Sequence, residues 1–148
     1  MNNYPLPPTE VIAILEDRKE SFLLRDITSD VFTYFGHHPL LPQYYCKGSD
    51  TNRLKGRQII AKCIEDNNLN CIAVPQKYIY RFREDCKTLV LAEYIEEISL
   101  GTLSSEEITQ LTIVKNKTGF VDFRSNIRKE KNGLLFIIDT ELDGFIDP

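Results

Sequence analysis

Long hydrophobic runs are missing from this sequence. No uninterrupted apolar stretch is longer than residues 134–138, which is far shorter than the about 20 residues that a membrane-spanning helix needs. The first five residues lack the basic and apolar regions of a secretory signal, and low-complexity tracts and internal repeats are absent. We therefore expect no membrane association and a cytoplasmic location, or the cytosol of a host cell if the protein is a secreted effector.

Cysteine pairs of the kind that bind metals are missing as well. The four cysteines, at positions 46, 63, 71 and 86, stand singly, and neither His37 nor His38 is spaced to complete a zinc site with them. Adjacent residues of a strand point to opposite faces, so the two histidines are also a poor shared site, and we predict that they lie in a loop. Buried, reduced thiols are expected.

The sequence has no excess of basic residues. It carries 18 Lys and Arg against 22 Asp and Glu, a net charge of −4, whereas proteins that bind nucleic acid through its phosphates usually have a basic surface. The one basic cluster, Arg124, Arg128, Lys129 and Lys131, lacks the interleaved aromatic residues of a single-strand platform. We therefore expect no nucleic-acid partner.

The composition is that of a globular protein. The 148 residues, 42% hydrophobic and 27% charged, suit a single domain over residues 1–148 with its own core. In the first half, Thr9 is predicted to cap a short helix, and residues 36–39 are predicted to break the chain between strands. Strands are predicted at residues 22–24, 31–35 and 44–47, followed by a helix from Ser49 or Asp50 to about residue 68.

The second half predicts three strands, a helix and a hairpin. The strands are residues 71–74, 78–80 and 87–95; the helix is residues 106–117, capped by Ser104 or Ser105 and stopped by Gly119. Asn132-Gly133 is a two-residue turn signal between strands at residues 126–128 and 134–138. Helices and strands do not alternate regularly, which predicts an α+β fold with a central antiparallel sheet and flanking helices.

Consecutive segments of the second half resemble the protein-kinase-like fold. Residues 88–95 resemble the last N-lobe strand and the hinge, and residues 105–118 resemble the helix before the catalytic loop. Gly-Phe-Val-Asp-Phe-Arg-Ser-Asn, residues 119–126, resembles that loop, and residues 132–141 resemble the hairpin that bears the metal-binding aspartate. The resemblance covers residues 44–141 and is most specific in its last third. It implies an N-lobe-like sheet and helix over residues 9–95 and a minimal, truncated C-lobe over residues 101–148.

This resemblance implies a metal site and a catalytic base. Asn126 and Asp139 would hold Mg²⁺, which prefers hard oxygen ligands and neutralises phosphate charge. Asp122 would occupy the position of the base that accepts a hydroxyl proton.

The same resemblance implies a site for ATP. Lys47 would contact the phosphates as a point charge. The backbone at Glu93 and Ile95 would hydrogen-bond an adenine edge.

Several features of the family are absent. Asp122 and Asn126 are one residue closer than is usual, Phe120 replaces a histidine, and no glycine-rich loop precedes Lys47. Asp139-Thr140-Glu141 replaces aspartate-phenylalanine-glycine, and the chain ends nine residues after Asp139. Two functions therefore stay open. One is a truncated kinase-like domain that binds nucleotide and Mg²⁺, with phosphoryl transfer in question. The other is a catalytically inactive kinase-like module for protein interaction or regulation.

A third interpretation is an unrelated α+β interaction domain. A turn aspartate such as Asp122, a strand-start asparagine such as Asn126 and an exposed strand lysine such as Lys47 are commonplace. Asp139 is more telling because it directly follows the apolar run at residues 134–138. We also expect an exposed apolar surface within residues 101–148, where a protein partner or a second copy of the chain would bind.

Overall fold

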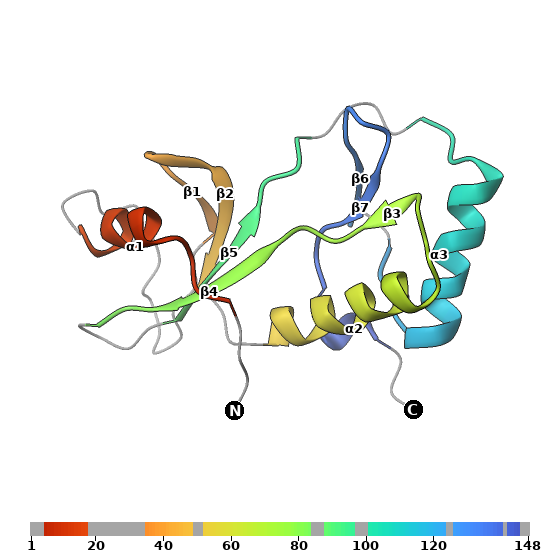
Figure 1. The fold of residues 1–148 in the computed structure, drawn as a ribbon, viewed down its shortest axis with the longest axis horizontal. Helices are drawn as coiled ribbons and strands as arrows, with labels where there is room; N and C mark the ends of the chain where they lie inside the picture. Colours follow the sequence, from red (N-terminus) through yellow and green to blue (C-terminus); the bar gives the residue numbers. More distant parts are fainter. Residues whose placement is uncertain are drawn as a thin grey trace. The chain divides into compact units, whose positions relative to one another are not determined.

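The computed structural model describes residues 5–17, 35–48, 52–83, 88–96, 101–123, 126–140 and 142–145. The elements follow the order α1-β1-β2-α2-β3-β4-β5-α3-β6-β7, ending in a short 3₁₀ helix, η1 (Leu142–Gly144) (Figure 1). The predicted α+β class is confirmed. Contacts divide the chain into an N-terminal unit, Met1–Thr51 and Gln76–Tyr94, and a C-terminal unit, Asn52–Pro75 and Ile95–Pro148. The predicted lobe division, residues 9–95 and 101–148, stays a prediction.

The N-terminal unit is built on a four-stranded antiparallel sheet in the order β1-β2-β5-β4. Its strands are β1 (Phe35–His38), β2 (Leu41–Gly48), β4 (Lys77–Arg81) and β5 (Thr88–Glu93). Side chains alternate across a strand, so Cys46, Leu89 and Leu91 share one face and are fully buried there. They pack in one cluster with Val11 and Leu15 of helix α1 (Thr9–Glu16). The predicted strands 44–47 and 78–80 are confirmed, and the strand predicted at 87–95 is confirmed over Thr88–Glu93. Residues 22–24, 31–34 and 87 lie outside the described residues.

The two histidines lie in strand β1, not in the predicted loop, and the chain turns only at Pro39–Leu40. Their side chains have opposite environments, as adjacent strand residues should. His38 is buried, and its Nδ1 accepts a hydrogen bond from Leu40 N at 3.0 Å. His37 is exposed, and its Nδ1 donates to the Tyr44 carbonyl at 2.8 Å. The loop prediction was wrong because pairing with β2 makes this segment a strand, and that pairing cannot be seen in the local composition.

Helix α1 is present as predicted, but its cap is not Thr9. Pro8 is the N-cap residue, without a side-chain cap hydrogen bond, and Thr9 is already helical. The amides of Val11 and Ile12 donate to the Pro8 carbonyl, both at 3.0 Å. Proline fixes the extended backbone that the N-cap position requires, so the helix begins one residue earlier than a threonine cap would allow.

The C-terminal unit has a second sheet, whereas the sequence predicted one central sheet. Its order is β3-β7-β6, with β3 parallel and β6 antiparallel to β7. The strands are β3 (Ile72–Ala73), β6 (Ile127–Lys129) and β7 (Leu135–Ile137). All three residues of β7 are buried. Helices α2 (Asn52–Asp66) and α3 (Ser105–Thr118) contribute Ile60, Leu111 and Val114 to the same core.

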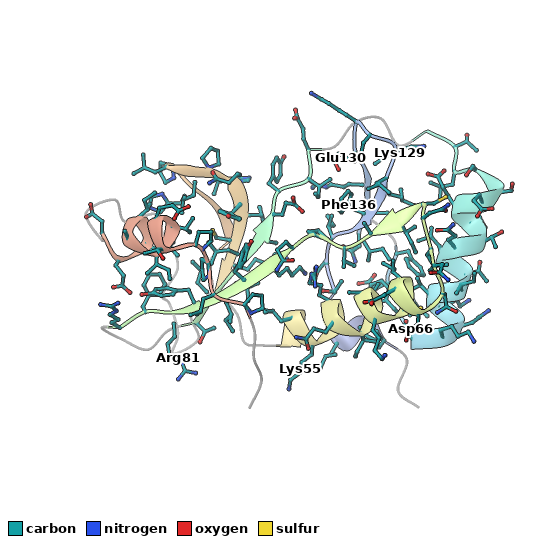
Figure 2. The ribbon with its side chains drawn as sticks, viewed as in Figure 1. Lys55, Asp66, Arg81, Lys129, Glu130 and Phe136 are labelled. Carbon is teal, nitrogen blue, oxygen red and sulfur yellow. The ribbon has the colours of Figure 1, made fainter. Side chains whose placement is uncertain are left out.

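The β6–β7 hairpin turns over three residues, not the predicted two. Glu130 N donates to the Leu134 carbonyl and Gly133 N donates to the Glu130 carbonyl, both at 2.9 Å. Gly133 has φ +90°, which side chains other than glycine rarely tolerate, so the glycine ends a turn whose next residue resumes pairing. Figure 2 labels Lys129, Glu130 and Phe136 on this hairpin.

Helix α3 has the predicted ends. Ser104 and Glu107 form a reciprocal capping box: Glu107 N donates to Ser104 Oγ at 3.1 Å, and Ser104 N donates to Glu107 Oε1 at 2.8 Å. Gly119 ends the helix with φ +82°. The other Glu107 oxygen, Oε2, lies 3.3 Å from Lys129 Nζ, so the cap also joins α3 to β6. The Ser104 amide, with Lys129 in addition, holds the pKa of Glu107 below its ordinary value although burial raises it.

The described cysteines are free thiols. Cys46 and Cys63 are buried and Cys71 is partly exposed, so the prediction of burial holds for the first two. Burial raises the pKa of Cys46 to about 12, which keeps that thiol neutral and unreactive. Cys86 lies outside the described residues. Within the part of the chain that the structure describes, no helix has the length and apolar character needed to traverse a bilayer.

The Glu107 cap gives a prediction on stability and its pH dependence. Glu107→Gln keeps an oxygen that can accept from Ser104 N but loses the charge opposite Lys129, so we expect a loss of about 1 kcal/mol in unfolding free energy at pH 7. The lowered folded pKa means that the carboxylate stabilises above its unfolded pKa, near 4.5, and ceases to do so as pH falls through the folded value. Urea unfolding should therefore show the difference between the two proteins begin to shrink as pH falls below about 5, and disappear only below the folded pKa.

Glu65→Gln is the matched control, because Glu65 is exposed on α2. It should change stability by less than about 0.5 kcal/mol at any pH. A constant difference between wild type and Glu107→Gln down to pH 4 would contradict the assignment of the ion pair.

Candidate functional site

The loop after α3 is anchored by aromatic residues. Phe120 is fully buried, and its ring lies 5.2 Å from that of Phe123 and 5.0 Å from that of Phe145, centroid to centroid. Phe120 also forms an isolated antiparallel bridge with Phe145, and Val121 N donates to the Gly144 carbonyl at 2.9 Å. The loop is therefore fixed on both sides of the exposed residue Val121, directly before Asp122.

Asn126 joins the two segments that carry the predicted acids. Its Nδ2 donates to the Asp122 carbonyl at 2.8 Å, and its own carbonyl accepts from Ile138 N at 2.8 Å. The structure thus brings Asp122, Asn126 and the residue before Asp139 into one hydrogen-bonded group. With Nδ2 engaged by Asp122, the amide oxygen Oδ1 is directed to the other side of the Asn126 side chain.

Asp139 lies where a buried strand reaches the surface. It follows Ile138 at the end of β7 and is half-buried, whereas the next residue, Thr140, is completely buried. Asp122, by contrast, is exposed. Asp139 therefore lies between a half-buried and a completely buried residue, whereas the Asp122 side chain stands in solvent.

These residues offer oxygen ligands of the type that hard cations prefer. Within the described ranges, no three His, Cys, Asp or Glu side chains are grouped so as to hold a metal ion. The side chains of Asn126 and Asp139 could supply two oxygens, leaving the remaining positions to water or phosphate. That division is usual for Mg²⁺, which keeps several waters and needs one or two protein carboxylates.

The predicted nucleotide residues lie partly in the other unit. Lys47 is on β2, half-buried, with Nζ 5.7 Å from the centroid of the Tyr45 ring. Glu93 N donates to the Gln76 carbonyl at 2.9 Å, and the Ile95 carbonyl accepts from Arg128 Nη1 at 3.0 Å. These two backbone groups are already engaged within the protein. The roles of Lys47, Glu93 and Ile95 at a nucleotide stay predictions.

Two residues that the sequence reading missed lie against this group. Gly56 of α2 packs against the backbone of Thr140, and Gly144 packs against Phe120 and Asp122. A glycine inside a helical pattern is the available sequence signal for Gly56. Its partner, eighty-four positions along the chain, has no local signal.

The loop bond gives a test of this geometry. Asn126→Ala removes the donor to the Asp122 carbonyl while leaving the backbone bonds of residue 126, so we expect a loss of about 1 kcal/mol in unfolding free energy. Asn126→Asp, which keeps the size but lacks the donor, should lose a similar amount. Denaturant unfolding measures both. Asn116→Ala, at an exposed position of α3, is the control and should not destabilise. Asn126 variants as stable as the wild type would show that the bond does not hold the loop.

Comparison with protein-family models, with curated proteins and with solved structures gives no match to this chain. The kinase-like resemblance therefore stays an expectation that comes from the residues alone. What the structure adds is a local fact: the loop residues Asp122 and Asn126 and the residue before the strand-end acid belong to one hydrogen-bonded group.

Proposed function

We propose that the C-terminal unit binds a divalent cation, Mg²⁺, through Asn126 and Asp139, and with it the phosphates of a nucleotide such as ATP. The observation that carries the proposal is the hydrogen bond from Ile138 N to the Asn126 carbonyl, at 2.8 Å. It joins the residue before the strand-end carboxylate to the residue with the amide oxygen. Two residues with hard oxygen atoms, Asn126 and Asp139, are thereby held close together along the paired chain segments.

The chemistry of such a site needs few protein ligands. A magnesium ion bound by one carboxylate and one amide retains positions for phosphate oxygens, whose charge it neutralises. Asn126 is suited to this because its Nδ2 is occupied by the Asp122 carbonyl, which leaves Oδ1 as the coordinating atom. The site is therefore of the kind that binds a metal–phosphate complex better than the metal alone.

Phosphoryl transfer would require one more group. In the proposal Asp122 is the base, since it is exposed and linked to Asn126 through its carbonyl. Its carboxylate would accept the proton of an attacking hydroxyl. Proton transfer to Asp122 thus extends the proposal from nucleotide binding to catalysis.

A catalytically inactive module is the second candidate. Ile108 of α3 is 52% exposed and Val121 is 40% exposed, so residues 101–148 present apolar side chains to solvent. Such residues favour a partner surface when they are grouped. Under this function the unit would still fold as described, but Asp122 would have no catalytic role.

Thermal unfolding tests the binding proposal. A ligand at ten times its Kd adds about 1.4 kcal/mol to the native state, which should raise the Tm of the wild type by about 3–6 °C with ATP and Mg²⁺ together. Asp139→Asn keeps the side-chain size but removes the charge, and it should abolish the rise. ATP alone and Mg²⁺ alone should give smaller rises than the pair.

Asp66→Asn is the matched control. Asp66 lies near the end of α2 (Figure 2) and pairs with Lys62 at 3.1 Å with both side chains exposed, so its loss should cost little and leave the rise intact. No rise with millimolar ATP and Mg²⁺ would contradict the proposal and favour the inactive module. A rise that survives in Asp139→Asn would place the ligand elsewhere.

A further inference from the structure

Gly56 is the fifth residue of helix α2, a position where alanine would favour the helix more. Gly56 is buried within Asn52–Asp66, and it is neither a cap nor a left-handed residue. Interior glycine weakens a helix because it gains backbone freedom on unfolding. A packing reason is therefore required.

That reason is the backbone of Thr140. A Cβ at position 56 would overlap the Thr140 carbonyl oxygen, lie 2.9 Å from its carbonyl carbon and lie 3.2 Å from Phe145 Cε2. Backbone atoms cannot rotate away as a flexible side chain can. Thr140 is itself completely buried, and such a close approach is typical of a Cα–H···O contact. Helix α2 thus fixes the chain one residue beyond Asp139.

Gly144 makes a similarly close contact at the other end of the segment that begins at Thr140. A Cβ there would lie 2.9 Å from Phe120 Cε1 and 3.1 Å from Asp122 Cβ. The Gly144 carbonyl also accepts from Val121 N at 2.9 Å. We call residues 140 and 142–145 the C-terminal strap. One end of the strap adjoins Asp139 and the other contacts Asp122, and helix α2 contacts η1 between them (Figure 1).

We infer that Gly56 and Gly144 are positioning residues: by admitting the C-terminal strap at close range, they set the placement of Asp139 relative to the loop of Asp122 and Asn126. The function of this placement rests on the proposed cation site, whereas the placement itself follows from the packing contacts alone. A larger residue at either position displaces the strap, and the displacement reaches Asp139 through Thr140 or reaches Asp122 directly.

Amide hydrogen exchange tests the placement without a ligand. Ile138 N bonds to the Asn126 carbonyl at 2.8 Å, and Leu135 N bonds to the Cys71 carbonyl at 2.9 Å within the core. In Gly56→Ala we expect protection at Ile138 to fall at least tenfold more than protection at Leu135, because the local site opens while the core persists. Equal changes at the two amides would overturn the inference.

Gly101→Ala is the matched control. Gly101 has φ +61° with no atom within 4 Å of an added Cβ, so alanine there strains the backbone without touching the strap. It should lower Ile138 and Leu135 protection by the same factor. A selective loss at Ile138 in this variant as well would show that any destabilisation has this effect, and it would overturn the inference.

Phe145→Leu provides a second route if Gly56→Ala does not fold. The Phe145 ring contacts both the Gly56 position and Phe120, so a smaller side chain loosens the strap without a clash. The same selective fall at Ile138 is expected, and its absence would count against the inference.

Titration with Mn²⁺ and ATP, followed by thermal unfolding, separates this inference from the proposed function. If the wild type binds, Gly56→Ala should bind at least tenfold more weakly, and unchanged binding would overturn the positioning role. If the wild type does not bind, the proposed function fails, and the exchange experiment still decides whether the glycines place Asp139.

Discussion

Strand β7 is bonded to β3 on one side and β6 on the other, and all three of its side chains are buried. Both faces of the strand are covered, so moving it by even one residue would exchange the side chains of the two faces and disrupt the packing on each. Its register is therefore the constraint on which the C-terminal unit depends. Asp139 inherits a fixed position from it, since only Ile138 separates the acid from the strand. The same register aligns Ile138 N with the Asn126 carbonyl.

Close packing also holds the chain in place beyond the end of β7. Chain segments beyond a strand normally have no ladder to hold them, but here Gly56 lets the backbone of α2 approach Thr140 and Gly144 lets the strap approach Phe120. The loop of Asp122 is thus held by contacts from both sides. A site made in this way would be largely formed before a cation arrives, which lowers the entropy cost of binding.

Local signals in the sequence predicted most of the fold. The Ser104 capping box, the Gly119 stop and the glycine turn of the β6–β7 hairpin depend on neighbouring residues, and the structure has them close to their predicted positions. Pairings between distant segments were not predictable in this way. The sequence gives no local sign that β3 lies parallel to β7, or that His37 and His38 belong to a strand. The site shows the same division: Asp139 is marked by its apolar run, whereas the contact between Gly56 and Thr140 exists only in the folded chain.

The central claim is that Asn126 and Asp139 hold one cation. Paramagnetic broadening of backbone amide resonances by Mn²⁺, added in substoichiometric steps with ATP, tests it most directly because the effect falls steeply with distance from the ion. The account predicts that the amides of Asn126, Ile138 and Asp139 broaden first, while those of Glu65 and Asp66 on α2 stay sharp. Broadening spread over the surface acids, or concentrated at Glu106 and Glu107, would contradict it.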